Sequence, residues 1–280
     1  MTAAPREIEA AGHDGHRWKL IARVPASPRA ALLWLPALGV AARHYEAFAD
    51  ALAAHGIAVV LHEWRGNGRS SLRPSRACDW GYREILTIDL PASQQVLCDI
   101  APGIPSLIGG HSLGGQLACC HAALHPHAFA RVWLVASGMP WWRSFPAPLR
   151  YALPLVYRFL PWLARRHGVL PGRRVGFGGT EARGLIADWA RVGLSNRYAA
   201  KGLDADLEAG LAQLSIPVDS VVLANDWMAP ASSMRALTAK MAGETRLDVL
   251  SAAALGARAD HFSWMKTPAA VAARLVRDTA

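Results

Sequence analysis

A serine lies between two glycines at a point where the sequence pattern changes. The pentapeptide Gly110-His111-Ser112-Leu113-Gly114 follows an apolar run and precedes an alanine-rich helical pattern. Glycines two residues on either side of Ser112 remove the side chains that would collide in a sharp bend between a strand and a helix. Such a bend holds the serine in a strained backbone geometry with its hydroxyl exposed. The pattern therefore predicts a catalytic nucleophile at Ser112 rather than a turn that only connects two elements.

Strand-like and helix-like segments alternate along most of the chain. Residues 6–24 are typical of a hairpin that turns at Asp14-Gly15. The alternation that follows predicts an α/β fold, with a mostly parallel central sheet and helices on both faces. Ligands bind such sheets at the carboxyl ends of the strands, so the loops there should carry the chemistry. After the hairpin, the predicted strands are Ala31–Leu35, Ile57–Leu61, Ser106–Ile108, Val132–Ala136, Val218–Ala224 and Thr245–Leu250. The predicted helices are Tyr45–His55, Ile85–Asp99 (with its start or a kink left open by Pro91), Leu113–Leu124, Ser232–Ala242 and Pro268–Arg277.

A second glycine-rich turn follows the strand predicted at Ile57–Leu61. It reads Glu63-Trp64-Arg65-Gly66-Asn67-Gly68-Arg69-Ser70. This tract resembles the D-x-R-G-x-G-x-S turn of the α/β-hydrolase fold family, with Glu63 in the aspartate position. The resemblance extends over essentially the whole chain, and it is nearest to bacterial predicted hydrolases of the serine-aminopeptidase and monoacylglycerol-lipase branch. It implies the α/β-hydrolase fold with a helical lid inserted after the sixth strand. The core domain would then comprise residues 1–138 and 213–280, and the lid residues 139–212.

A serine hydroxyl needs a base to remove its proton and an acid to orient that base. The family order of serine, acid and histidine points to His261, in the loop between the last predicted strand and the last predicted helix. His111 adjoins the serine but cannot easily reach around the turn to act as the base. Asp226 is the predicted acid, because it follows the strand Val218–Leu223 and matches the family's strand-end D-x-x-x-P pattern. Asp260, the neighbour of His261, is the alternative acid.

Two backbone N–H groups should stabilise the oxyanion that forms during acyl transfer. One should come from Leu113, the residue after the nucleophile. The other should come from the loop after the strand Ala31–Leu35, which reads Pro36-Ala37-Leu38-Gly39 where the family usually has His-Gly. Because a backbone donor needs no particular side chain, Leu38 is the predicted second donor and Ala37 is the alternative.

The formal net charge of +9 is concentrated in one segment. Residues 139–200 hold ten arginines but only two acidic residues, a net charge of +8, and ten of the 22 aromatic residues. Because burying an unpaired guanidinium is costly, we expect the arginines on the outer face and the aromatic side chains turned inward over the serine. The apolar run Leu149–Arg166 should form short pieces, broken at Pro154 and Pro161. An alternative interpretation is an interfacial helix whose arginines make a weak contact with anionic lipid.

Composition and motifs exclude several other classes of protein. Apolar residues make up 52% of the 280 residues and charged residues 18%, which excludes intrinsic disorder. The sequence contains no run apolar enough to span a bilayer and no C-x-x-C pair. Because no apolar h-region is visible either, we expect no secretory signal and reduced thiols in the cytoplasm. No metal, dinucleotide or nucleic-acid motif is present. We therefore expect no cofactor, no metal and no nucleic-acid partner.

Together these features predict an esterase-type serine hydrolase that acts on a small-molecule ester with an apolar acyl group. A thioesterase or acyltransferase with the same triad is the alternative enzyme. A hydrolase-fold binding protein without turnover is the alternative outside the enzymes. An aminopeptidase is disfavoured, because it should offer carboxylates to the ammonium group of its substrate and the lid has only two acids among ten arginines.

Overall fold

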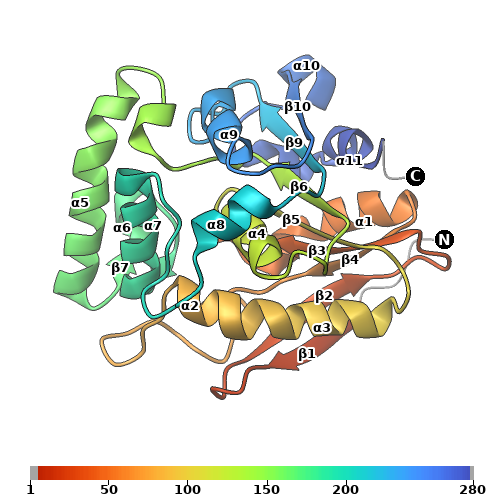
Figure 1. Cartoon of the computed structure of the whole chain (residues 1–280), viewed down its shortest axis with the longest axis horizontal. Coiled ribbons are helices and arrows are strands. Elements are labelled where there is room, and N and C mark those ends of the chain that lie inside the picture. The colour runs from red at the N-terminus through yellow and green to blue at the C-terminus, as the bar shows by residue number, and fades with distance from the viewer. Residues whose placement is uncertain (1–5, 278–280) are drawn as a thin grey trace.

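The computed structural model describes residues 6–277 and centres on one eight-stranded sheet (Figure 1). The strands lie in the order β1-β2-β4-β3-β5-β6-β9-β10. β2 pairs antiparallel with β1 and β4, and all other neighbours pair parallel. The predicted α/β-hydrolase fold is therefore confirmed. The strands are β1 (Arg6–Ala11), β2 (Arg17–Arg23), β3 (Ala30–Leu35), β4 (Ile57–Leu61), β5 (Ser106–His111), β6 (Arg131–Val135), β9 (Val218–Leu223) and β10 (Thr245–Leu250).

Helices cover both faces of this sheet, as the apolar strand sequences require. β3 and β4 are buried along their whole length, and every residue of both strands is apolar, because each face of a covered parallel sheet packs on helices. One apolar cluster packs α1 (Glu46–Ala54) and α11 (Ala269–Val276) on one face. The other cluster packs α3 (Leu90–Ile100), α4 (Leu113–Leu124) and α8 (Leu207–Gln213) on the opposite face (Figure 1). Two further helices, α9 (Ala231–Thr238) and α10 (Ala252–Leu255), flank β9 and β10.

The helix predicted over Ile85–Asp99 is longer than expected and contains a wide turn. It begins as α2 (Tyr82–Glu84), continues through a π-helical turn at Ile85–Asp89 and becomes α3. Pro91 lies in the first turn of α3, directly after the π turn. A proline supplies no N–H, and a change of hydrogen-bond pattern at that point lets the helix continue without a break.

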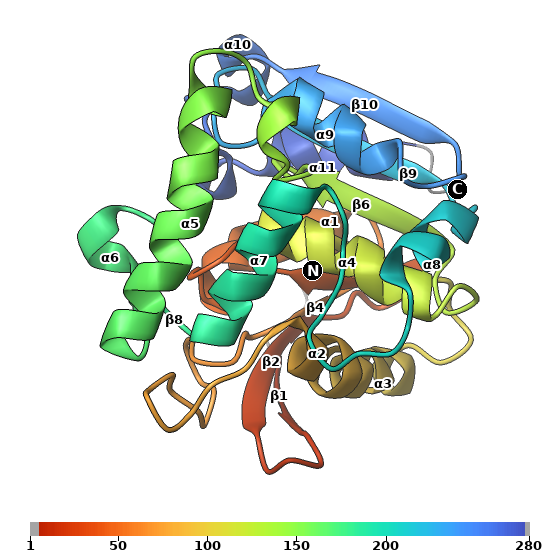
Figure 2. The same ribbon diagram turned by 60° about the vertical axis from the view of Figure 1, so that its left-hand side comes forward.

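Between β6 and β9 the chain leaves the sheet and forms a layer of helices at one end of it (Figures 1 and 2). The layer consists of α5 (Leu149–His167), the short strands β7 (Leu170–Pro171) and β8 (Thr180–Glu181), α6 (Gly172–Val175) and α7 (Arg183–Ser195). In Figure 2, α5 and α7 lie side by side. The outer ends of the predicted core domain, residues 1–5 and 278–280, lie outside the described residues.

The run Leu149–Arg166 lies in one continuous helix, α5, so the expected breaks at Pro154 and Pro161 are wrong. Each proline removes one backbone N–H donor, but the helix also packs along its length on α7. The two helices approach so closely that a Cβ at Gly193 would lie 2.5 Å from the ring of Tyr157. This packing holds the helix together across both prolines, which the local sequence could not reveal.

The expected placement of charged and aromatic residues in segment 139–200 is confirmed only in part. Eight of the ten arginines are exposed, and the other two are half-buried. The aromatic side chains do not all turn inward, however, because Tyr151, Phe159 and Trp162 on α5 are 48% to 63% exposed. Together with Leu155 they occupy one outer stripe of the helix, since positions four, eight and eleven residues apart lie on the same side.

Among residues 6–277, no helix is both long enough and apolar enough to cross a membrane. All four cysteines lie in the described part of the chain and none of them forms a disulfide. The cytoplasmic location stays a prediction.

Candidate active site

The turn between β5 and α4 has the geometry expected of a nucleophile elbow. Ser112 lies at the turn with a φ of 56° and a ψ of −121°, a backbone conformation that is strained for a residue with a side chain. A Cβ at Gly110 would lie 2.3 Å from the carbonyl carbon of Gly114, and a Cβ at Gly114 would lie 2.1 Å from the oxygen of Leu35. Both glycines are therefore needed for the chain to make this bend.

His261 and Asp226 come together although 35 residues separate them in the sequence. They follow the adjacent strands β10 and β9, whose carboxyl ends meet at the same edge of the sheet. The Nδ1 atom of His261 lies 2.7 Å from Oδ2 of Asp226, and both residues are 5% exposed. The other carboxylate oxygen of Asp226 accepts hydrogen bonds from the backbone N–H groups of Met228 and Ala229. These bonds hold the carboxylate in the position that orients the imidazole ring.

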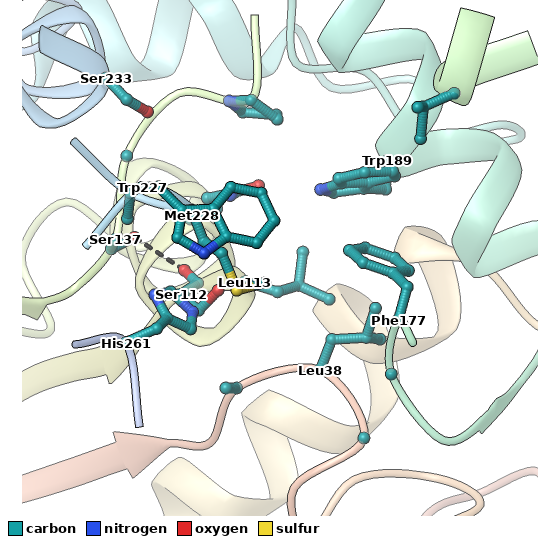
Figure 3. Close-up of a pocket in the computed structure, with 18 of the residues that line it drawn as sticks. Leu38, Ser112, Leu113, Ser137, Phe177, Trp189, Trp227, Met228, Ser233 and His261 are labelled. Atoms are coloured by element: carbon teal, nitrogen blue, oxygen red, sulfur yellow. Dashed lines mark hydrogen bonds between the residues drawn. The ribbon is translucent and has the colours of Figure 1, made fainter. Parts of the chain in front are cut away.

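The pair with Asp226 does not use the other ring nitrogen of His261. Its Nε2 atom is buried and has no hydrogen-bond partner among the described residues. Figure 3 shows the imidazole of His261 next to Ser112 at the wall of the pocket. The three predicted triad residues thus lie in sequence-distant loops that the sheet brings to one place.

Asp260, the alternative acid, is engaged elsewhere. Its carboxylate accepts hydrogen bonds from the backbone N–H groups of Phe262 and Ser263 and from the Ser263 hydroxyl, and it pairs with Arg258. Although slight burial acts to raise it, the pKa of Asp260 is lowered by the hydrogen bonds from Ser263 and Phe262 and by the charge of Arg258. The hydrogen bonding of the two carboxylates therefore favours Asp226 as the partner of His261.

Hydrogen bonding also distinguishes the two candidates for the second oxyanion donor. The N–H of Ala37 donates to the hydroxyl of Tyr45 at 2.9 Å, so it is not available to a substrate. The N–H groups of Leu38 and Leu113 donate no hydrogen bond to any described residue, and both residues line the pocket. The pattern of free N–H groups favours Leu38 and Leu113.

Tyr45 is a residue of the site that sequence reasoning missed. It is fully buried, and its hydroxyl also lies 2.8 Å from Nδ1 of His111. Burial lowers the pKa of His111 well below its usual range, so this histidine stays neutral and bound to Tyr45. His111 therefore does not line the pocket, which agrees with its exclusion as the base. No short motif marks Tyr45, because its partners come from two other segments of the chain.

The turn Glu63–Ser70 lies outside the pocket and holds neighbouring segments together. The buried carboxylate of Glu63 accepts hydrogen bonds from the N–H groups of Ala42 and Arg69. Arg65 forms two hydrogen bonds to Asp89. Burial raises the pKa of Glu63, and the longer side chain at the family's aspartate position still reaches its N–H partners. The tract has a structural role here.

A cavity of about 540 Å³ opens beside Ser112 and is mostly apolar. The sheet side contributes Ser112, Leu113 and His261 to its wall. The helical layer contributes mainly apolar side chains, among them Leu149, Leu153, Val156, Tyr157, Phe177 and Trp189 (Figure 3). No carboxylate is present among the described residues of the wall. Nor do residues 6–277 contain a group of three histidine, cysteine, aspartate or glutamate side chains that could hold a metal ion.

Comparison with known proteins gives two sequence matches of different extent. The family described as serine aminopeptidase, S33, matches residues 26–187, which is more than half of the chain. The chloroplastic pheophytinase of Arabidopsis thaliana is 30% identical over 143 residues, in a match that covers 43% of this chain. That match covers 29% of the pheophytinase, so the chain spans less than a third of the length of this curated relative.

Solved structures share the fold at low sequence identity. A hydrolase from Pseudomonas aeruginosa is 22% identical, with a TM-score of 0.61 and 97% of each chain covered. The esterase domain of a Rhodothermus marinus protein is 17% identical, with a TM-score of 0.62, and the match covers 98% of this chain and 94% of that one. The family match includes the elbow at Ser112, and with the sheet order it shows that this chain belongs to the serine aminopeptidase S33 family of α/β hydrolases.

Proposed function

We propose that this protein is a serine hydrolase that cleaves carboxylic esters through a triad of Ser112, His261 and Asp226. The observation that carries the proposal is the buried pair of His261 and Asp226, whose free Nε2 atom adjoins Ser112 on the wall of an apolar cavity. A base oriented by a carboxylate and placed beside a serine is the arrangement that activates a hydroxyl as a nucleophile.

The reaction then proceeds in two halves. His261 Nε2 accepts the proton of the Ser112 hydroxyl while Oγ attacks the ester carbonyl carbon. The N–H groups of Leu38 and Leu113 donate to the resulting oxyanion. His261 gives its proton to the leaving alcohol, and an acyl-enzyme remains. Water, deprotonated by His261, attacks the acyl-enzyme, and the acid leaves as the serine regains its proton. Asp226 stabilises the imidazolium that forms in each half.

The wall of the cavity supports an apolar acyl group and argues against a peptide amine. Leucine, valine and aromatic side chains from α5 and α7 form most of the wall. An aminopeptidase should place a carboxylate near the ammonium group of its substrate, whereas the described wall offers Arg173 and no acid. The proposed substrate is therefore an uncharged ester and not a peptide.

An activity-based fluorophosphonate probe tests this proposal directly. The probe should label the wild-type protein covalently and should not label Ser112→Ala, because only an activated serine attacks the phosphorus. Labelling is measured by in-gel fluorescence after equal exposure, and circular dichroism confirms that both proteins are folded. A folded wild-type protein that takes up no probe would leave a binding protein as the better interpretation.

We further propose that residues 139–212 act as a lid over a core made of 1–138 and 213–280. Side chains from α5 and α7 lie across the cavity from Ser112, which is the position that a lid would occupy. The loop before β8 also touches the loop that carries Leu38, because a Cβ at Gly39 would lie 2.4 Å from the backbone nitrogen of Gly179. A substrate would therefore reach Ser112 under this layer.

The outer stripe of α5 supports a weak contact of this lid with anionic lipid surfaces. The stripe contains Tyr151, Leu155, Phe159 and Trp162, and the helix carries four arginines but no acidic residue. Exposed aromatic and apolar side chains among arginines are typical of helices that lie in the interface of a membrane. Each arginine near an anionic surface is worth about 1 kcal/mol at moderate ionic strength.

A vesicle experiment checks this contact. Hydrolysis of an ester presented in phosphatidylglycerol-containing vesicles should slow about tenfold between low salt and 1 M salt, where the screening length is about 3 Å. A water-soluble short-chain ester should be hardly affected. The double variant Phe159→Ser, Trp162→Ser should bind the vesicles less, whereas Val249→Ser, at an exposed site on β10, should bind as the wild type does. If salt and the double variant change neither rate nor binding, the lipid contact is wrong.

A further inference from the structure

We propose that Gln116 recognises a hydroxyl group on the acyl chain of the substrate, within a few carbons of the scissile carbonyl. This proposal rests on the proposed esterase function and deepens it by naming a class of substrate. The side-chain amide of Gln116 lines the cavity, and neither the triad nor the oxyanion hole uses it.

Among the described residues of the wall, two have a buried polar side-chain atom without a hydrogen-bond partner. They are His261, through Nε2, and Gln116, through Oε1. The reaction accounts for the first of them. Gln116 is 5% exposed, and leaving a buried amide oxygen without a partner costs free energy. A hydrogen-bond donor in the bound substrate would remove that cost.

Apart from that of Ser112, the hydroxyl groups of the described wall, including that of Tyr157, already have partners. The hydroxyl of Ser137 donates to the backbone oxygen of Ser112 at 2.7 Å, and the hydroxyl of Ser233 donates to the oxygen of Met139 at 2.7 Å. Each of these bonds fixes a loop beside the elbow and directs the hydroxyl proton away from the cavity. Among the buried polar side chains of the described wall, Gln116 is therefore the one best suited to bind a polar substituent of the substrate.

The position of Gln116 defines where that substituent should be. Its backbone N–H donates to the oxygen of Ser112 at 3.3 Å in the first turn of α4. The side chain thus lies one helical turn beyond the nucleophile, roughly 6 Å along the helix axis. An acyl chain bound to Ser112 would pass it within the first few carbons from the carbonyl.

The chemistry of the amide selects a hydroxyl over other polar groups. A hydroxyl can donate to Oε1 or accept from Nε2, so it satisfies the amide in either orientation. A carboxylate or an ammonium group would need a charged partner in this apolar wall, and Gln116 carries no charge. The class of substrate is therefore an ester whose acyl chain carries a hydroxyl near the carbonyl, such as a 3-hydroxyacyl ester.

The test compares two esters that differ in one hydroxyl, ethyl hexanoate and ethyl 3-hydroxyhexanoate, with acid release followed by titration. The wild-type protein should hydrolyse the hydroxy ester with a kcat/KM about tenfold higher, as one buried hydrogen bond allows. Gln116→Met, which keeps the size of the side chain, should lose this preference and hydrolyse ethyl hexanoate as fast or faster. Ser233→Ala is the matched control, and it should alter both rates by the same factor.

A binding measurement separates this proposal from the esterase proposal. Calorimetry with Ser112→Ala should give about tenfold tighter binding of 3-hydroxyhexanamide than of hexanamide, and Gln116→Leu in that background should abolish the difference. If neither ester is hydrolysed but this difference is found, the esterase proposal fails and the recognition by Gln116 holds. Equal binding of the two amides, or a preference that survives in both Gln116 variants, would overturn the recognition.

Discussion

Replacing Ser112 with alanine is expected to lower kcat by at least about 10⁴-fold, the largest loss of any single change in this protein. The reason is that no other serine of the described cavity wall can replace it as the nucleophile. The hydroxyl groups of Ser137 and Ser233 already donate to backbone oxygens, whereas Nε2 of His261 is free. Hydrolysis of p-nitrophenyl hexanoate at neutral pH measures the loss. Binding of a substrate-like amide should stay close to the wild-type value, because alanine removes only one oxygen atom from the wall.

A triple variant tests whether the three residues act together. Ser112→Ala combined with His261→Ala and Asp226→Ala should be little slower than Ser112→Ala alone, because residues that act as a unit have non-additive effects. Thermal unfolding should show that each variant is folded before its rate is interpreted. A triple variant that is slower than Ser112→Ala by a further factor of a thousand would mean that His261 and Asp226 serve another process.

Replacing Asp226 with asparagine is expected to lower kcat by about 10⁴-fold, because the imidazole loses the carboxylate that sets its tautomer and stabilises its charge. Asp260→Asn is the matched control, since this carboxylate is adjacent to His261 but bonds to Phe262 and Ser263 instead. It should lower thermal stability slightly and leave kcat within about threefold of the wild type. The two rates are compared on the same ester at the same pH.

The comparison of these two variants decides the acid. Asparagine at position 226 can keep the hydrogen bonds from Met228 and Ala229, so the loop should remain in place. The loss of rate then reports the missing charge and not a disordered loop. If Asp260→Asn were the inactive variant and Asp226→Asn nearly normal, the assignment of the acid would have to move to Asp260.

Local features of the sequence were enough to predict the frame of this protein. The periodic apolar runs of β3, β4 and α4 determine strand or helix over a few residues, and α4 begins and ends at the predicted Leu113 and Leu124. The bend at Ser112 depends on glycines two residues away on each side, so it too is encoded locally. These predictions needed no contact between distant segments, which is why they could be made from the chain alone.

Contacts between distant segments decided the rest. Asp226 and His261 pair because β9 and β10 are neighbours in the sheet, and this contact supports the choice of Asp226 over Asp260, the closer residue in the sequence. The N–H of Ala37 donates to the hydroxyl of Tyr45, whereas the N–H of Leu38 stays free. No short sequence motif encodes this difference.

Packing overruled the local signal in the helical layer and in the cavity. α5 continues through two prolines because it packs on α7, and the same packing leaves Phe159 and Trp162 on the outside. In the sequence, Gln116 is an ordinary helical residue. Only the folded structure buries its amide oxygen and leaves it without a partner. Local sequence sets which conformations are favourable, but burial and pairing across the fold determine which side chains remain free to react or to bind.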